Sequence, residues 1–126
     1  MPARLRPADP AEVREAHARL ADDTATRADL KLLVKHYLAL LEARAPGHSV
    51  EVRVPPFAAV QVIEGVRHTR GTPPAVVETD ARTWIALAVG ELTWPDALDA
   101  ARASASGERT DLAPYLPLSG GAVAGR

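Results

Sequence analysis

The stretch RHTRGT, residues 67–72, places two arginines and a histidine beside hydroxyl side chains and a glycine. Guanidinium groups bind carboxylates and phosphates through paired hydrogen bonds, and a glycine amide is open to close approach. The candidates for an anion site, or for contact with an acidic partner, are Arg67, His68, Arg70 and Gly71. The same residues also suit a structural turn, in which Gly71 takes an unusual backbone angle and Arg70 pairs with a glutamate. The turn is the favoured interpretation.

The other polar residues lack the patterns that catalysis needs. The four histidines are scattered, and none has the His-x-x-x-His or Glu-x-x-His spacing of a metal site. No serine lies in a nucleophile-elbow motif, and there is no cysteine for thiolate chemistry or a zinc site. Asp80 suits a helix cap better than a catalytic base. We therefore expect no enzymatic activity, no metal and no cofactor.

Composition narrows the class of protein further. A chain of 126 residues with 47% hydrophobic residues is most simply one domain. A net charge of −1 argues against a nucleic-acid binder that neutralises phosphates. No segment has the ~20 apolar residues of a membrane span, and the N-terminus does not resemble a secretory signal. The absence of cysteine fits a reducing compartment, so we expect a cytoplasmic protein.

Two helices are predicted before the first strand. The first begins after Asp9, a suitable cap, with Pro10 at its first position. The second covers about residues 27–45, and its apolar residues recur at helical spacing. This apolar stripe consists of Leu30, Leu33, Val34, Tyr37, Leu38 and Leu41. A second, weakly apolar face around Leu32 and His36 is expected to contact the first helix or another subunit, so a homodimer is one expectation.

The period then changes from helical to alternating. Residues 49–54 predict a strand with one wet face, 57–65 a second strand antiparallel to it, and 75–79 a third. Asp80 and Gly90 are expected to cap a helix between them, and Thr93 another. Short strands are expected on either side of a turn at Ser106 and Gly107. In this interpretation residues 1–8 are flexible, 9–118 form the single domain, and 119–126 are a disordered tail.

A family resemblance is carried by three stretches, VRVPPFAAVQVIEG, RHTRGTPPAVVETDARTWIALAVGELTW and ASASGERTDLAPYLPL. Together they resemble the bacterial branch of the sterol-carrier-protein-like family over roughly residues 25–118. The resemblance implies an α/β (α+β) fold, with a mixed, mostly antiparallel five-stranded sheet and helices packed on one face. It also implies an apolar tunnel between sheet and helices that holds lipids, acyl chains or sterols without a cofactor.

The resemblance suggests which residues line such a pocket. The candidates are Phe57, Val60, Val62, Trp84, Leu87, Trp94 and Leu98. For the two tryptophans, ordinary core packing is the favoured alternative, because each ring buries on the order of 200 Å² and aromatic residues are few. The leading hypothesis is therefore a non-catalytic domain that binds a lipid or other apolar small molecule. The alternative is a protein–protein interaction or structural module without a ligand, using helix 27–45 and the loop 67–74.

Overall fold

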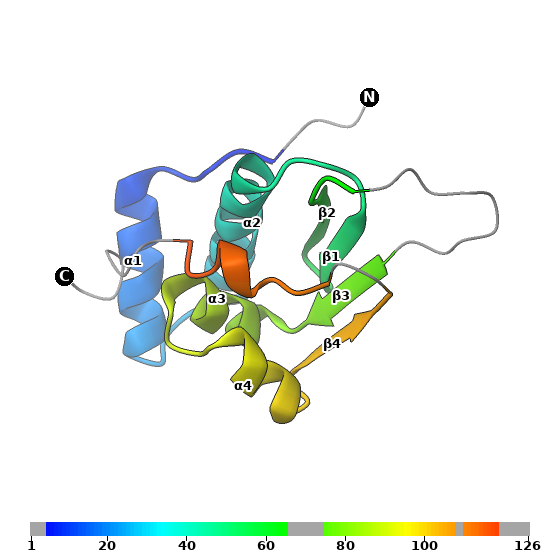
Figure 1. Ribbon diagram of the computed structural model, residues 1–126. Helices are drawn as coiled ribbons and strands as arrows, with labels where there is room; N and C mark the ends of the chain where they lie inside the picture. The colour runs from blue at the N-terminus through cyan, green and yellow to red at the C-terminus, as the bar shows by residue number, and fades with distance from the viewer. Residues whose placement is uncertain (1–4, 66–74, 108–109, 119–126) are drawn as a thin grey trace.

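The computed structural model describes residues 5–65, 75–107 and 110–118. Its elements are α1 (Pro10–Ala21), α2 (Arg27–Arg44), β1 (Val50–Val54), β2 (Ala58–Val62), β3 (Ala75–Thr79), α3 (Ala81–Val89), α4 (Trp94–Asp99), β4 (Ala103–Ser106) and the 3₁₀ helix η1 (Ala113–Tyr115). The helices and the sheet form one mixed α/β arrangement, as the sequence predicts (Figure 1).

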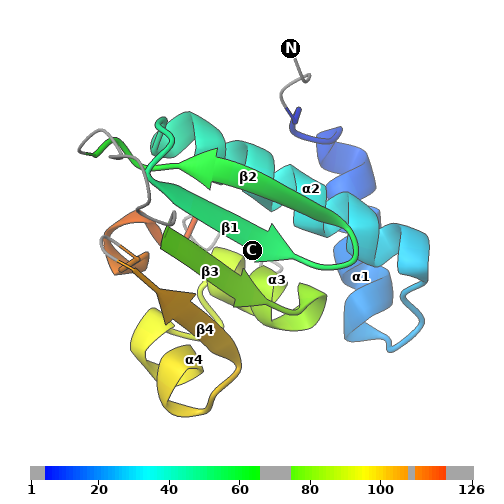
Figure 2. The same ribbon diagram turned by 90° about the vertical axis from the view of Figure 1, so that its right-hand side faces the viewer.

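The strands lie in the order β2-β1-β3-β4. β1 pairs antiparallel with β2 and parallel with β3, and β3 pairs antiparallel with β4. Figure 2 shows the helices behind the sheet, so one face of the sheet is covered and the other is open. The alternation in β1 matches these two faces, because its valines are buried while Arg53 is exposed. The predicted one-sided sheet is therefore confirmed.

The expected fifth strand is not present among the described residues, where the sheet has four strands. After β4 the chain forms η1 instead of a strand. Pro114 and Pro117 remove two amide donors from this segment, which makes a strand ladder unfavourable there. Its carbonyl groups find a side-chain donor instead: the Arg44 guanidinium donates to the carbonyls of Tyr115 and Pro117 at 3.1 and 2.9 Å.

The helix ends agree with the predicted caps. Asp9 accepts hydrogen bonds from the first amides of α1, Asp80 accepts from Thr83 in α3, and Thr93 accepts from Asp96 in α4. Gly90 ends α3 with φ +84°, a left-handed angle that a glycine adopts without strain. These caps depend on neighbouring residues only, which explains why the sequence predicts them well.

The core lies between the covered face of the sheet and α2 with α3. The predicted stripe of α2 is buried at five of its six positions, and only Leu30 is partly exposed. The stripe packs into one cluster with the inward valines of β1, β2 and β3 and with α3. α1 lies on the far side of α2 from the sheet, as a further layer (Figure 1). Among the described residues, no helix has the length and apolar character needed to cross a bilayer.

Replacing Arg44 with alanine tests how the C-terminal segment is held. We expect Arg44→Ala to lower the free energy of unfolding by about 1 kcal/mol, because three carbonyls lose their side-chain donor. Amide hydrogen exchange in residues 110–118 should accelerate more than exchange in the sheet. Arg82→Ala, an exposed arginine on α3, is the matched control and should change neither measurement.

Candidate ligand-binding layer

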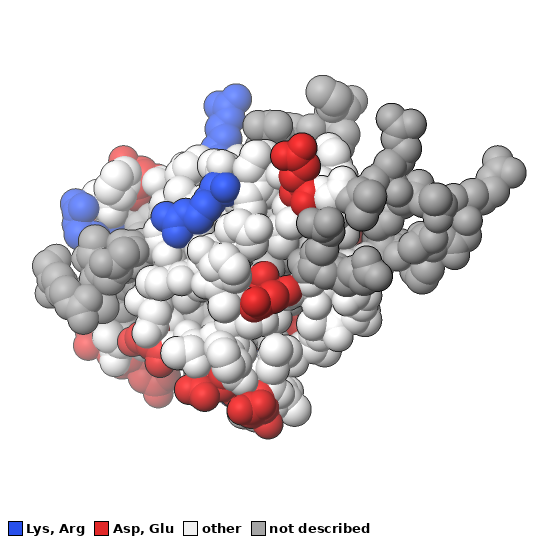
Figure 3. Space-filling view, in the orientation of Figure 1, with Lys and Arg blue, Asp and Glu red and all other residues white. Residues whose placement is uncertain are grey.

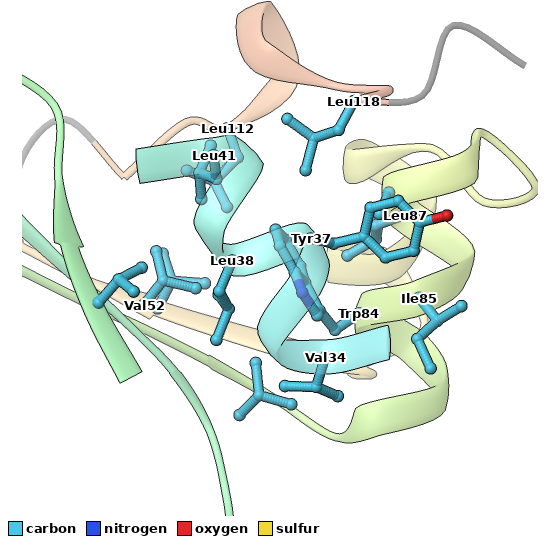
Figure 4. Close-up of a cluster of buried hydrophobic side chains, with 14 of the residues drawn as sticks. Val34, Tyr37, Leu38, Leu41, Val52, Trp84, Ile85, Leu87, Leu112 and Leu118 are labelled. Carbon is cyan, nitrogen blue, oxygen red and sulfur yellow. The ribbon is translucent and has the colours of Figure 1, made fainter. Parts of the chain in front are cut away.

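The predicted pocket residues are brought together in one buried layer, with two exceptions. Val60 and Val62 of β2, Trp84 and Leu87 of α3 and Trp94 of α4 belong to the same apolar cluster. Each is at most 7% exposed, and Trp84 and Leu87 are fully buried. Leu38 of α2 belongs to the same cluster as Trp84 (Figure 4). These side chains thus fill the space between the sheet and the helices.

The two exceptions lie at the margins. Phe57, in the turn between β1 and β2, is half-buried, and the Arg27 guanidinium lies 5.1 Å from its ring centre. Leu98 on α4 is 38% exposed and is the large apolar side chain that stands out on the described surface. Neither side chain contributes to the closed interior in this structure.

Trp84 carries an unpaired polar group inside this layer. Its indole Nε1 is buried and has no hydrogen-bond partner. In the described residues, every other buried side-chain nitrogen or oxygen has a partner. Buried polar groups in proteins are nearly always paired, because an unpaired one costs about 1–3 kcal/mol. The layer therefore holds one N–H donor that an incoming oxygen atom could satisfy.

No cation accompanies that donor. The buried polar residues of the described chain are Asp29, Ser49, Thr79 and Thr83, and none of them is a lysine, arginine or histidine. A carboxylate brought next to Trp84 would remain without a counter-charge in a medium of low polarity, which is strongly unfavourable. The chemistry of the layer thus suits a neutral guest with one acceptor oxygen.

Two open clefts lie at one end of the sheet, where β1 and β3 end. The first, of about 330 Å³, is lined by Pro55, Glu78, Thr79, Asp80, Ala101, Arg102, Ala103 and Ser104. The second, of about 410 Å³, is lined by Arg53, Pro55, Pro56, Phe57, Ala58, Ala59 and Glu78. The second lies on the open face of the sheet, and the first lies at its rim. Of the predicted pocket residues, only Phe57 lines either cleft.

Asp80, beside the first cleft, serves as a helix cap. Burial alone would raise the pKa of its carboxyl group, but hydrogen bonds from the Thr83 hydroxyl and amide outweigh burial and lower the pKa. Arg102 donates to the same Thr83 hydroxyl at 3.3 Å. These groups satisfy one another, so Asp80 has the structural role that the sequence predicts.

A polar cluster between α1 and α2 was not predicted from the sequence. His17 Nε2 lies 2.7 Å from the hydroxyl of Tyr37, and burial raises the pKa of Tyr37 to about 12. His36 Nδ1 lies 2.9 Å from the backbone nitrogen of Ala8. At the other end of this helix contact, Arg19 donates twice to Asp29 at 2.8 Å. The weak second face of α2 therefore contacts the first helix, one of its two expected partners.

The surface charges are unevenly distributed. Acidic side chains gather along the lower edge of the molecule in the view of Figure 3, below α4. The exposed acidic residues on and next to α4 are Glu91, Asp96 and Asp99. Leu98 belongs to the same short helix. An apolar side chain in acidic surroundings is poorly suited to receive an anion.

Several predictions concern residues that the structure does not describe. The loop residues Arg67, His68, Arg70 and Gly71, like residues 1–4 and 119–126, lie outside the described residues. In the part of the chain that is described, no three His, Asp or Glu residues are grouped as metal ligands would be. Site reasoning from the sequence also omitted Leu38 and Leu41 of α2, although their helical spacing marked them as buried.

Comparison with protein-family models places most of the chain in a known family. Residues 26–118 match the family described as "Bacterial SCP ortholog", where SCP denotes sterol carrier protein. The chain belongs to this family. A search of curated proteins finds no match to it. The matched range includes α2, α3, α4 and all four strands, and it begins after α1.

Truncating Trp84 tests how much the layer depends on its ring. We expect Trp84→Ala to lower the free energy of unfolding by about 3–5 kcal/mol, because a fully buried indole leaves a large cavity. Leu98→Ala, at the exposed position on α4, should change it by less than about 0.5 kcal/mol. Urea denaturation measures both values, and equal effects of the two variants would contradict the packing described.

Proposed function

We propose that this protein is a non-catalytic binding domain that holds a neutral, lipid-like molecule between its sheet and its helices. Membership of the sterol-carrier family suggests a carrier-like domain, and the family is generally not catalytic. The observation that carries the proposal is the buried, unpaired N–H of Trp84. A guest with an alcohol, ester or ketone oxygen would pair with this donor and remove its desolvation cost.

The charges of the site restrict the class of guest. Because the described layer contains no buried cation, a fatty acid would have to enter in its protonated form or leave its carboxylate in water. The acidic residues on and next to α4 also disfavour the approach of a carboxylate. Fatty alcohols, sterol-like alcohols and esters meet neither difficulty. A neutral guest with a long apolar part is therefore the favoured class.

Room for the guest has to come from separation of the layers. Sites for such molecules have volumes of about 300–1,000 Å³, whereas the predicted lining residues pack closely in this structure. We place Val60 and Val62 on the sheet side of the site, Trp84 and Leu87 on the helix side, and Leu98 with Trp94 at its mouth. Binding should then be slow and should increase the hydrodynamic volume of the protein.

The alternative of an interaction module finds less support. Helix 27–45 corresponds to α2, whose two apolar faces are covered by the sheet-facing core and by α1 with the preceding segment. Little apolar surface of α2 is left for another chain. The loop 67–74 of that alternative lies outside the described residues. We therefore retain the carrier interpretation as the better supported.

Binding of three matched fluorescent polyenes tests the proposal: a fatty alcohol, the fatty acid of equal length, and the hydrocarbon. We expect saturable binding, with the alcohol binding about 2–10-fold more tightly than the hydrocarbon, since one hydrogen bond contributes about 0.5–1.5 kcal/mol. The fatty acid should bind most weakly at pH 8. Absence of saturable binding of all three probes would overturn the carrier function.

The Trp84→Phe variant identifies the donor. It keeps an aromatic ring but removes the N–H, so the advantage of the alcohol over the hydrocarbon should disappear while hydrocarbon binding persists. Trp94→Phe is the matched control and should preserve the advantage. If Trp84→Phe keeps the alcohol's advantage, Trp84 is not the group that binds the oxygen.

A further inference from the structure

The contact between α1 and α2 depends on an uncharged histidine. A backbone amide can only donate a hydrogen bond, so the Ala8 N–H requires a lone pair on Nδ1 of His36, 2.9 Å away. The His36 proton therefore lies on Nε2 in this structure. Protonation would place a hydrogen on Nδ1, directed at another hydrogen. The segment that leads into α1 is thus fastened by a group that must remain neutral.

A second histidine lies in the same contact. His17 of α1 lies 2.7 Å from the buried hydroxyl of Tyr37, and both imidazoles have edge-to-face contacts with the Tyr37 ring. Neither imidazole forms an ion pair with a carboxylate among the described residues, whose salt bridges are Arg19–Asp29 and Arg53–Glu51. A proton on both histidines would therefore bring two positive charges into one half-buried contact without compensation.

We propose that α1 is a pH-sensitive strap, which leaves α2 when His36 and His17 take up protons and thereby uncovers the face of α2 that carries Tyr37.

The environment of the two imidazoles fixes the direction of the effect. Burial lowers the pKa of His36, and burial together with the nearby His36 lowers the pKa of His17, both from an ordinary value of 6.5. The released histidines therefore bind protons more readily than the docked ones. Docking is complete above neutral pH and weakens as the pH falls below about 6.5, by up to tenfold per pH unit for each histidine.

The other charged pair in this contact does not share the transition. Arg19 donates to Asp29 at the opposite end of the interface, and this hydrogen bond, with that from the Thr26 amide, keeps the pKa of Asp29 far below its usual range. Both groups remain charged throughout the histidine range. The contribution of this pair to the docking of α1 is therefore the same at pH 8 and at pH 5.

We expect the rest of the domain to stay folded when α1 is released. Among the described residues, α1 contributes only Val13 and Ala16 to the buried set, while most of the core comes from α2, α3 and the strands. The family match likewise begins at residue 26, after α1. Loss of the strap should therefore leave the β-sheet and the Trp84 layer folded.

Spin labels on two introduced cysteines test the proposal, because the chain contains no cysteine of its own. Ala18 on α1 and Ala59 on β2 are exposed, and α1 and β2 lie on opposite sides of α2 (Figure 1). In a titration from pH 8 to pH 5, double electron–electron resonance should show a second, longer distance between the two labels below about pH 6.5. Tryptophan fluorescence and circular dichroism on the same samples report whether the core stays folded.

Substitutions separate the histidines from general acid effects. In His36→Asn a neutral oxygen replaces Nδ1, and in His17→Gln a neutral amide replaces Nε2, so the doubly substituted protein should stay docked at pH 5. Each single variant should retain about half of the pH dependence of docking that the wild type shows. His48→Gln is the matched control, because His48 bonds to Gln61 beside the sheet and should leave the wild-type transition unchanged.

Three results would overturn the proposal. The distances of the wild type could remain those of the docked helix at pH 5. The doubly substituted protein could release α1 as the wild type does. The core could unfold together with α1, which would show that the helix is an integral part of the domain and no strap.

Discussion

The apolar stripe of α2 packs into one cluster with the inward valines of the sheet and with α3, and the other contacts follow from this constraint. Five of the six stripe residues and the inward side chains of β1 are buried, and α3 adds Trp84 to the same layer. With most of the stripe occupied by the core, the side of the helix that carries His36 and the Tyr37 hydroxyl is left for α1 and the segment before it. The C-terminal segment then fastens to the end of the same helix through Arg44. One helix thus organises three layers.

The sequence predicts the elements well where the signal is local. Capping by Asp9, Asp80 and Gly90 depends on residues within one turn, and the alternation in β1 depends on the pleat alone. The number of strands depends on long-range pairing, which no local pattern specifies. The segment after β4 shows this, because its prolines and its distant donor, Arg44, decide its conformation. The expectation of five strands is accordingly wrong by one strand in the described residues.

In the candidate site, too, some features follow from local sequence and others only from contacts between distant residues. The pocket candidates Trp84, Leu87 and the β2 valines, which the family resemblance suggested, are buried. Hydrogen bonding inside the core does not follow from the sequence, since the unpaired N–H of Trp84 is defined by what surrounds it in three dimensions. The bond between Ala8 and His36 joins residues 28 positions apart, and only the folded chain reveals it. Polar relationships across elements are therefore the part that the sequence leaves open.

The parallel pairing of β1 with β3 has a consequence for biosynthesis. β2 follows β1 after a short turn, so this hairpin can close while the chain is still leaving the ribosome. The other edge of β1 has to wait for β3, which is translated later. During that interval an alternating valine strand presents unpaired amides to neighbouring nascent chains. This exposure lasts until Ala75–Thr79 has left the ribosome and paired with β1.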